Sequence, residues 1–223
     1  MTGLQYEFRE CQNADCRFRY PAPIGNAPLG PNLPAADCPK CGAQTVFAAH
    51  ASLTPEPAAA SRPVPTNSDA VLLDNLRSAW NVGSILRTAD GAGLHRIYLC
   101  GITPTPAHPR VTRTALGAQR TVEWSWHANA LLLARELLHK GYHLWALESI
   151  PQAKSITAMN RLPTDPPVVL IVGNEIAGID PELLGLAQTT FSIPMRGNKQ
   201  SLNAAVAFGI AAYQLEKIRS ASG

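Results

Sequence analysis

Three polar segments of this 223-residue chain carry side chains whose types and positions suit ligand chemistry. In the first, NVGSILRTADGAG (81–93), Asn81 is placed to cap a helix. Arg87 follows one turn inside that helix, near the cap and without an acidic partner. Such a guanidinium suits a phosphate or sugar oxygen, the alternative being an arginine on a solvent-exposed helical face. In the second segment, GNE (173–175), a glycine would admit a ligand against bare backbone, and Glu175 could accept from a ligand or orient Arg87. A plain surface turn is the alternative for this segment.

The third segment, RGNKQSLN (196–203), precedes the most apolar helix of the chain. Ser201 is placed as the N-cap of this helix, and Asn203 lies in its first turn, close to the cations Arg196 and Lys199. Because the helix is apolar, we expect its start to be buried. Polar groups at a buried helix N-terminus suggest a ligand site.

This C-terminal helix is apolar along two faces. One stripe consists of Leu202, Val206, Ile210 and Tyr213, and the other of Phe208, Ala211, Leu215 and Ile218. A helix that is apolar on both sides must be covered on both sides. We therefore expect one face to pack on the protein's own sheet and the other on a second subunit.

The glycines near these segments exclude two common phosphate-binding motifs. They form neither G-x-G-x-x-G nor G-x-x-x-x-G-K-[ST], so dinucleotide and P-loop sites lack their signatures. Gly83, in the first segment, would instead let another backbone or a phosphate approach the first turn of its helix.

Four of the five cysteines gather in the first fifth of the chain. Cys38 and Cys41 form a CPKCG knuckle, and Cys11 and Cys16 are separated by four residues. In a chain without an export signal, four such thiols indicate ligands of a structural Zn²⁺ ion rather than two disulfides. The segment has few large apolar residues, so the metal would supply much of its folding free energy. Cys100, inside an apolar run, is expected to be an inert core thiol.

Composition divides the chain into a Cys-bearing lobe over residues 1–48, a Pro/Ala-rich linker over 49–68 and a domain over 69–223. No apolar window approaches the length of a membrane span, and the N-terminus lacks the features of a signal peptide, so we expect a cytoplasmic protein.

The net charge of +3 is mild. The charged residues are unevenly distributed, because two long spans contain neither Asp nor Glu. This uneven distribution predicts a basic face. These spans hold Arg96, Arg110, Arg113 and Arg120 in one case and Arg196 and Lys199 in the other.

Apolar runs alternate with helical patterns along the domain. Strands are expected over 70–76, 96–101, 143–149, 167–175 and 189–195, and helices over 82–92, 128–140, 181–188, within RTALGAQRT and from Leu202 onward. Strands that are apolar throughout and separated by helices predict an α/β fold with a parallel sheet covered on both faces. Ligands of such sheets gather beyond the carboxyl ends of the strands, where the loops Arg77–Asn81, Gly173–Gly178 and Arg196–Ser201 would meet.

In order and spacing the three segments resemble the motifs of the SpoU/TrmH branch of the SPOUT RNA methyltransferases. NVGSILRTADGAG is similar to the first motif, IVGNEIAGID to the second and IPMRGNKQSLNAAVAFGI to the third, within Val71 to Ile218. The resemblance implies S-adenosylmethionine as methyl donor and the ribose 2′-hydroxyl of a tRNA or rRNA as acceptor. It also implies a SPOUT fold with a C-terminal trefoil knot and a homodimer paired through the terminal helix. The Cys-bearing lobe lies outside the resemblance, and its role stays open.

The resemblance also assigns roles to individual residues. The cofactor contacts would be Leu147, Gly173, Ile193, Met195, Ser201 and Leu202, and the polar catalytic set would be Asn81, Arg87, Glu175, Ser201 and Asn203. Arg87 would lower the pKa of the ribose hydroxyl through its charge, or hold a phosphate so that the reacting atoms lie in line. Since a guanidinium resists deprotonation, we prefer this electrostatic role to that of a base. RNA contacts would come from Arg110, Arg113, Arg120 and Arg196, and any zinc would be structural.

Two alternatives remain at this point. One is a non-catalytic RNA-binding protein on the same scaffold. The other is a SPOUT enzyme that methylates a base nitrogen instead of a ribose oxygen.

Overall fold

The computed structural model describes residues 6–24, 37–50, 68–159 and 166–221. The chain divides into two compact units, Met1–Ala58 and Ala59–Gly223. Of the linker expected over 49–68, residues 51–67 lie outside the described part of the chain.

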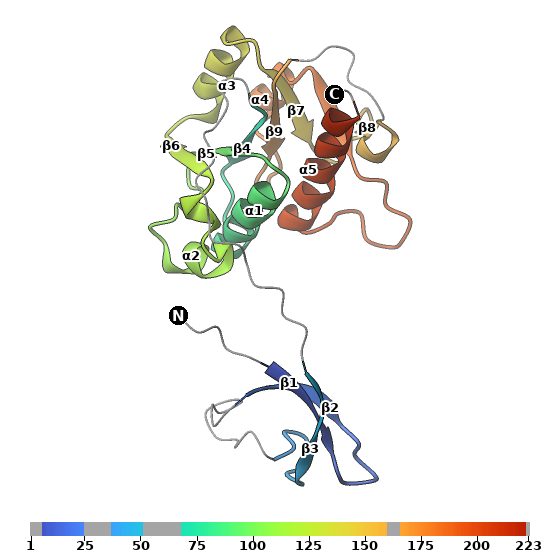
Figure 1. The fold of residues 1–223 in the computed structure, drawn as a ribbon. Helices are drawn as coiled ribbons and strands as arrows, with labels where there is room; N and C mark the ends of the chain where they lie inside the picture. The colour runs from blue at the N-terminus through green and yellow to red at the C-terminus, as the bar shows by residue number, and fades with distance from the viewer. Residues whose placement is uncertain (1–5, 25–36, 51–67, 160–165, 222–223) are drawn as a thin grey trace. The chain divides into compact units, whose positions relative to one another are not determined.

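The first unit contains a three-stranded antiparallel sheet with the strand order β2-β1-β3 (Figure 1). Its strands are β1 (Tyr6–Cys11), β2 (Arg19–Pro23) and β3 (Thr45–His50). None of these short strands was expected from the sequence, and the pairing of β1 with β3 shifts register between Phe8 and Arg9. Strand β3 also runs past the lobe boundary expected at residue 48.

The second unit is built on a seven-stranded sheet with the order β6-β5-β4-β9-β7-β10-β8, in which every pair is parallel. The strands are β4 (Ala70–Asp74), β5 (Arg96–Cys100), β6 (Glu123–His127), β7 (His143–Leu147), β8 (Lys154–Ser155), β9 (Val168–Val172) and β10 (Thr189–Ser192). The parallel α/β fold is thus confirmed. All five expected strands are present, and each ends one to three residues earlier than expected, where the chain enters the following loop. The edge strands β6 and β8 were missed, since β6 is mostly exposed and β8 has only two residues.

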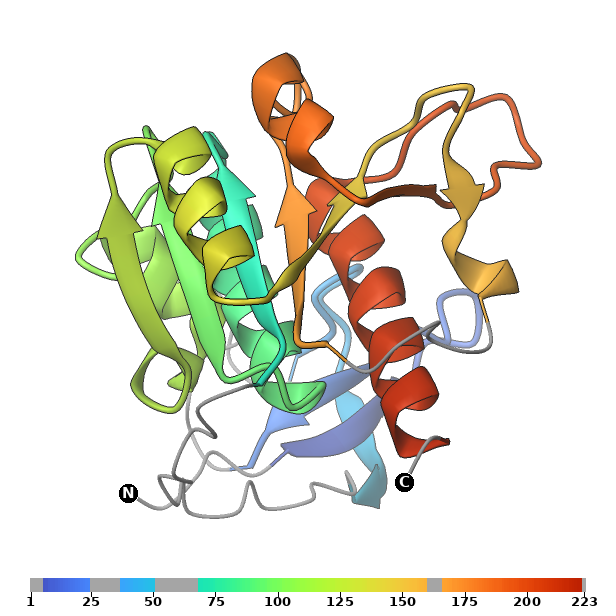
Figure 2. The ribbon, with the colours of Figure 1, turned by 90° about the horizontal axis from the view of Figure 1, so that it is seen from above.

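Helices cover both faces of this sheet (Figures 1 and 2). They are α1 (Ala79–Gly91), α2 (Pro109–Ala115), α3 (Ala130–His139), α4 (Pro181–Leu186) and α5 (Ala204–Ser220), with short 3₁₀ turns η1 (Ala118–Arg120) and η2 (Ile156–Ala158). Alternate residues of β4 face opposite cores. Val71 and Leu73 pack with α1, α2 and α5, whereas Ala70 and Leu72 pack with α3 and α4. No helix within the described residues is long and apolar enough to cross a membrane.

Two helix starts differ from the sequence expectation. Helix α1 is capped by Ser78, whose hydroxyl accepts from the Asn81 N–H at 3.3 Å, so Asn81 is not the cap. Helix α5 is capped by Asn203, whose side chain accepts from Ala205 N–H at 2.9 Å, and Ser201 stays in the preceding loop. Asn and Ser cap helices equally well, so composition alone did not decide between neighbouring candidates.

Gly83 is required by helix packing rather than by a ligand. A Cβ atom at this position would collide with the Thr114 side chain and lie 2.5 Å from the Val111 carbonyl oxygen of α2. Helices α1 and α2 therefore touch at Gly83. Of the two expected reasons for this glycine, the approach of another backbone is the one observed.

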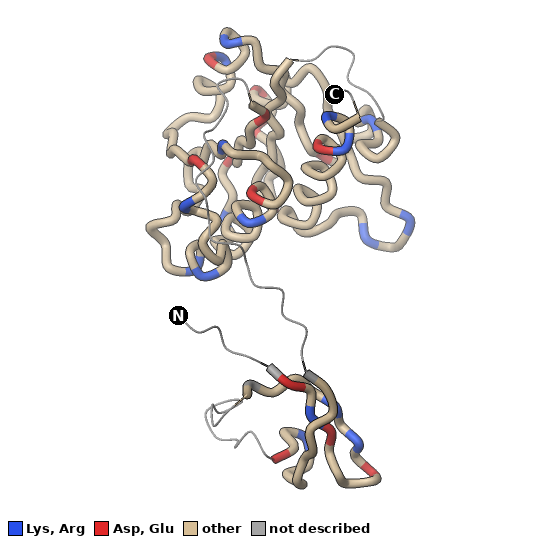
Figure 3. The backbone as a smooth tube through the Cα atoms, viewed as in Figure 1, with Lys and Arg blue, Asp and Glu red and all other residues tan. Residues whose placement is uncertain are grey.

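The arginines expected to contact RNA are exposed. Arg110 and Arg113 lie on α2, Arg120 on η1 and Arg196 in the loop before α5. Figure 3 shows basic residues on α1, α2 and this loop. Arg96 differs, because its guanidinium pairs with Glu123 on the neighbouring strand at 2.9 Å.

Candidate active site

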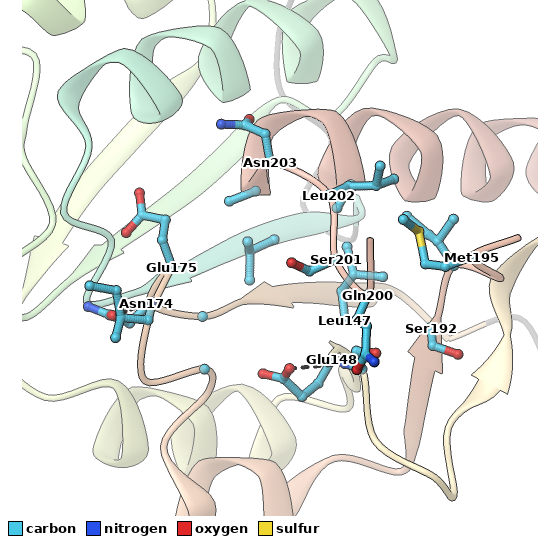
Figure 4. A pocket seen from close by; sticks show the side chains of 18 residues that line it. Leu147, Glu148, Asn174, Glu175, Ser192, Met195, Gln200, Ser201, Leu202 and Asn203 are labelled. Atoms are coloured by element: carbon cyan, nitrogen blue, oxygen red, sulfur yellow. Dashed lines mark hydrogen bonds between the residues drawn. The ribbon is translucent and has the colours of Figure 1, made fainter. Parts of the chain in front are cut away.

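A cavity of about 450 Å³ lies at the carboxyl ends of β7, β9 and β10 (Figure 4). Its lining comes from within residues 147–149 after β7, 172–178 after β9, 192–195 after β10 and 200–207 at the start of α5. Because the strands are parallel, loops that are far apart in sequence meet at one edge of the sheet. Two of the three expected loops line the cavity directly, and the third, Arg77–Asn81, is joined to it by hydrogen bonds.

All six residues expected to contact a cofactor line this cavity. They are Leu147, Gly173, Ile193, Met195, Ser201 and Leu202. The structure adds Glu148, Asn174, Ile176 and Gln200, among others, to the lining. Glu148 carries a signal that sequence reasoning could have used, since it is the first acid after a buried strand of a parallel sheet.

Gly173 owes its identity to the turn that follows it. A Cβ atom there would collide with the Ile179 N–H and lie 2.5 Å from the Gly178 carbonyl carbon. That turn is closed by two backbone hydrogen bonds between Asn174 and Gly178, at 3.0 and 2.9 Å. The glycine thus lets the chain fold back tightly, and the resulting turn forms one wall of the cavity.

Glu175 binds the start of helix α1. Its carboxylate accepts from the Arg77 N–H at 2.8 Å, the Ser78 N–H at 3.1 Å and the Asn81 side-chain amide at 2.8 Å. Burial acts to raise the pKa of Glu175, but these donors outweigh it and hold the pKa below the ordinary value. No hydrogen bond or ion pair joins this carboxylate to Arg87, so among the described residues its partners are donors at and just before the start of α1 rather than the expected guanidinium.

Asn81 and Asn203 continue this network to the third segment. The Asn203 side-chain amide donates to the Asn81 side-chain oxygen at 2.9 Å, while the Asn203 oxygen caps α5. Glu175, Asn81 and Asn203 therefore form a continuous chain of hydrogen bonds. This chain joins the loop after β9 to the starts of α1 and α5.

Arg87 lies outside this arrangement. Its side chain is exposed on α1, and it does not line the cavity. The neighbouring Thr88 lines a shallow apolar groove between α1 and α5, together with Val206 and Tyr213. Of the expected catalytic set, the structure brings together Asn81, Glu175, Ser201 and Asn203 and leaves Arg87 apart.

The first unit holds a separate candidate site. The sulfur atoms of Cys11, Cys16, Cys38 and Cys41 all lie within 4.8 Å of one another, with 3.5 Å between Cys11 and Cys41 and 3.9 Å between Cys16 and Cys38. Four thiolates around zinc at about 2.3 Å would lie about 3.8 Å apart, so this donor set fits a tetrahedral ion. Burial raises the pKa of Cys11 to about 12, whereas at Cys38 the backbone N–H groups of Cys41 and Lys40 outweigh burial and lower the pKa to about 7, so Cys38 is the readier of the two to ionise.

A sequence profile of the SpoU rRNA Methylase family matches residues 69–213. The chain belongs to the SpoU rRNA methylase family. The match spans the unit with the parallel sheet and includes all three polar segments. It leaves the cysteine cluster of this SpoU-family protein outside.

Individual relatives agree with this assignment. The tRNA (guanosine(18)-2′-O)-methyltransferase of Thermus thermophilus is 30% identical over 69% of the chain and 76% of the relative. The 23S rRNA (guanosine-2′-O-)-methyltransferase RlmB of Ralstonia nicotianae is 29% identical over 67% of the chain, which spans only 59% of that relative's length.

Solved structures show the same fold. The A. aeolicus TrmH/SpoU tRNA modifying enzyme superposes with a TM-score of 0.63 at 28% identity, covering 70% of this chain and 78% of that one. The AdoMet bound rRNA methyltransferase from Sinorhizobium meliloti gives a TM-score of 0.62 at 32% identity, over 67% and 56% of the two chains.

Proposed function

We propose that this SpoU-family protein is an S-adenosylmethionine-dependent RNA methyltransferase that acts on a ribose 2′-hydroxyl of a tRNA or rRNA. The observation that carries the proposal is the cavity at the carboxyl ends of β7, β9 and β10, where the second and third segments meet. The names of the relatives support the ribose oxygen as acceptor, since they are guanosine-2′-O-methyltransferases of tRNA and rRNA.

The cavity suits S-adenosylmethionine in size and chemistry. Its volume of about 450 Å³ lies in the range of small-molecule sites, and Leu147, Ile193 and Met195 supply apolar walls. Two carboxylates, Glu148 and Glu175, and no lysine or arginine occur among the lining residues described, which suits a ligand that bears a cationic sulfonium. When bound, the cofactor supplies an electrophilic methyl group.

The residues of this chain would prepare the acceptor. Glu175, Asn81 and Asn203 would hold the cavity wall and the starts of α1 and α5 in place through their hydrogen-bond chain. Ser201 would contact the cofactor or the acceptor. Arg87 is exposed and outside the cavity lining, so its guanidinium is accessible to a phosphate of the RNA and would position the nucleotide for transfer.

The decisive experiment compares Arg87→Ala with wild type, using tritium transfer to bulk RNA followed by digestion to nucleosides. Wild type is expected to produce 2′-O-methylated nucleosides, and Arg87→Ala to lose turnover while keeping affinity for S-adenosylhomocysteine. Arg135→Ala, which removes an exposed arginine of α3, is the matched control. Retained turnover in Arg87→Ala would contradict its catalytic role. RNA binding without any methylated product would indicate the non-catalytic alternative, and base-methylated nucleosides the nitrogen-methylating one.

RNA binding by Arg110, Arg113, Arg120 and Arg196 belongs to the same proposal. It is supported by their exposure on α2, η1 and the loop before α5. Binding should weaken steeply with added salt, and each arginine removed should reduce the slope of log affinity against log salt by about one.

We further propose a structural Zn²⁺ ion in the first unit, supported by the tetrahedral spacing of its four cysteine sulfurs. The domain division into a lobe, a linker and a methyltransferase domain is supported by the two compact units.

A homodimer paired through α5 is supported by the exposed apolar side chains of that helix, with Val206 and Tyr213 52% and 53% exposed. A C-terminal trefoil knot is part of the same proposal and is supported by the fold similarity to the A. aeolicus TrmH/SpoU tRNA modifying enzyme. We also propose a cytoplasmic location, which is in keeping with four cysteines arranged for a metal ion rather than for two disulfides.

A further inference from the structure

Glu148 is the second carboxylate of the cavity, and its surroundings differ from those of Glu175. It follows Leu147 at the carboxyl end of β7 and is half-buried. One carboxylate oxygen accepts from the Ile179 N–H at 3.0 Å and the other from the Ser149 N–H at 2.9 Å. Its own N–H donates to the Phe191 carbonyl oxygen at 2.9 Å. These bonds hold the side chain in one position on the cavity wall (Figure 4).

The two carboxylates differ in how much hydrogen-bonding capacity they retain. A carboxylate offers about four lone-pair sites. Glu175 fills three with donors of α1 and the residues before it, whereas two backbone N–H groups bind Glu148. Glu148 therefore keeps about two acceptor sites for a ligand.

Gly178 makes room for this carboxylate. A Cβ atom there would lie 2.7 Å from a Glu148 oxygen, and the backbone of Gly178 has a φ of +75°, which favours glycine. The tight turn after β9 is thus shaped around Glu148 on one side and closes the cavity on the other.

The strand order places Glu148 in the middle of the cavity. The carboxyl ends follow one another as β10, β7, β9 and β4. Ile193 and Met195 follow β10 and give that end of the cavity apolar walls, which suit an adenine ring, while Glu175 follows β9 and contacts the residues that join β4 to α1. In an adenosyl cofactor the ribose lies between the adenine and the sulfonium. A nucleoside laid along this row places its ribose over the end of β7, where Glu148 stands.

We propose that Glu148 accepts hydrogen bonds from the 2′- and 3′-hydroxyls of the ribose of bound S-adenosylmethionine. This inference rests on the proposed function. Two spare acceptor sites on a fixed carboxylate match two adjacent hydroxyl donors, and acidic side chains bind ribose hydroxyls in other nucleotide sites. Glu148 is thereby a cofactor-binding residue that selects for ribose, and the methyl-transfer step does not use it.

The test measures binding of unreactive nucleosides to the full chain by calorimetry. The ligands are S-adenosylhomocysteine, 5′-methylthioadenosine, which lacks the amino-acid part, and the 2′-deoxy and 3′-deoxy forms of 5′-methylthioadenosine. The proteins are wild type, Glu148→Ala, Glu148→Gln and the control Glu136→Ala, which lies on the exposed face of α3. Glu148→Gln keeps an oxygen for one of the two backbone donors. Tryptophan fluorescence of each protein checks that the fold is intact.

We expect both Glu148 variants to bind S-adenosylhomocysteine and 5′-methylthioadenosine about 10-fold more weakly, while Glu136→Ala matches wild type. Wild type should bind each deoxy form more weakly than 5′-methylthioadenosine, and Glu148→Ala should lose this discrimination. A loss for S-adenosylhomocysteine alone would overturn the inference, because the carboxylate would then meet the ammonium group. Unchanged affinities in both variants, or no discrimination against the deoxy forms by wild type, would also overturn it. If wild type binds none of these nucleosides, the proposed function itself fails.

Discussion

Replacing Glu175 by glutamine should loosen the junction between the loop after β9 and helix α1. In the structure the carboxylate accepts three hydrogen bonds, from the N–H groups of Arg77 and Ser78 and the side chain of Asn81. A glutamine oxygen placed toward Ser78 and Asn81 retains two of them, and the new amide then faces the Arg77 N–H, donor against donor. One hydrogen bond to a charged acceptor is lost, which typically costs about 1.5–3 kcal/mol. Because Glu175 is exposed, solvent screening reduces this to about 1 kcal/mol.

The effect should depend on pH in a defined direction. Burial acts to raise the pKa of Glu175, but the backbone donors and Asn81 lower it below the ordinary value of 4.5. A carboxyl with a depressed pKa in the folded state stabilises the fold fully above its unfolded pKa and loses that contribution as the pH falls through the folded pKa. The difference in unfolding free energy between wild type and Glu175→Gln is therefore largest near pH 7 and shrinks below about pH 4.5.

Urea unfolding followed by tryptophan fluorescence isolates the relevant unit. All four tryptophans of the chain lie within Ala59–Gly223, at positions Trp80, Trp124, Trp126 and Trp145. The signal thus reports the unit that contains Glu175, whatever the state of the cysteine-bearing unit. Glu136→Gln, on the exposed face of α3, is the matched control and should leave the unfolding midpoint unchanged. A wild-type stability equal to that of Glu175→Gln at pH 7, or a difference that is the same at pH 7 and pH 3.5, would refute this account of the junction.

Three further changes test other parts of the structure. Gly173→Ala introduces a Cβ into the turn closed at Gly178, so we expect about 1–3 kcal/mol of destabilisation and loss of S-adenosylhomocysteine binding in calorimetry; unchanged affinity would contradict the tight turn. Cys38→Ser should abolish a stoichiometric zinc content measured by mass spectrometry, while Cys100→Ala, which changes a buried thiol of the second unit, retains it; zinc retained in the first variant would argue against the tetrahedral site. If the proposed dimer forms through α5, Val206→Glu should convert it to a monomer in light scattering without lowering stability, since this side chain is 52% exposed; Leu132→Glu, at a 56% exposed position of α3, should leave the dimer intact, and a dimer that persists in Val206→Glu would place the interface elsewhere.

Local sequence was sufficient to predict the covered parallel sheet and the position of the cavity, but not the strands of the first unit or the edge strands β6 and β8. Apolar runs such as Val168–Val172 are buried along their whole length, and this pattern predicts strands of a covered parallel sheet. In a parallel sheet the carboxyl ends lie together, so the residues that follow each strand were expected to meet, and the cavity lies there. The two stripes of α5 also followed from sequence, because helical periodicity is a local property. Phe208 and Leu215 are buried on the core side, and Val206 and Tyr213 are exposed on the other.

The tertiary structure alone decided which polar groups pair. The Asn81 side chain was expected to cap a helix and instead bridges Glu175 and Asn203, partners 94 and 122 residues away in sequence. Gly83 and Gly173 were interpreted as openings for a ligand or a neighbouring backbone, and the approaching atoms belong to the chain itself. A side chain with several possible partners forms the bonds that packing brings within about 3 Å, and this distance depends on helices and loops that the local sequence does not place. The sequence therefore determined which polar residues are available near the site. The packing of α1 and α5 on the sheet determined which of them join in the hydrogen-bond chain and that Arg87 stays exposed.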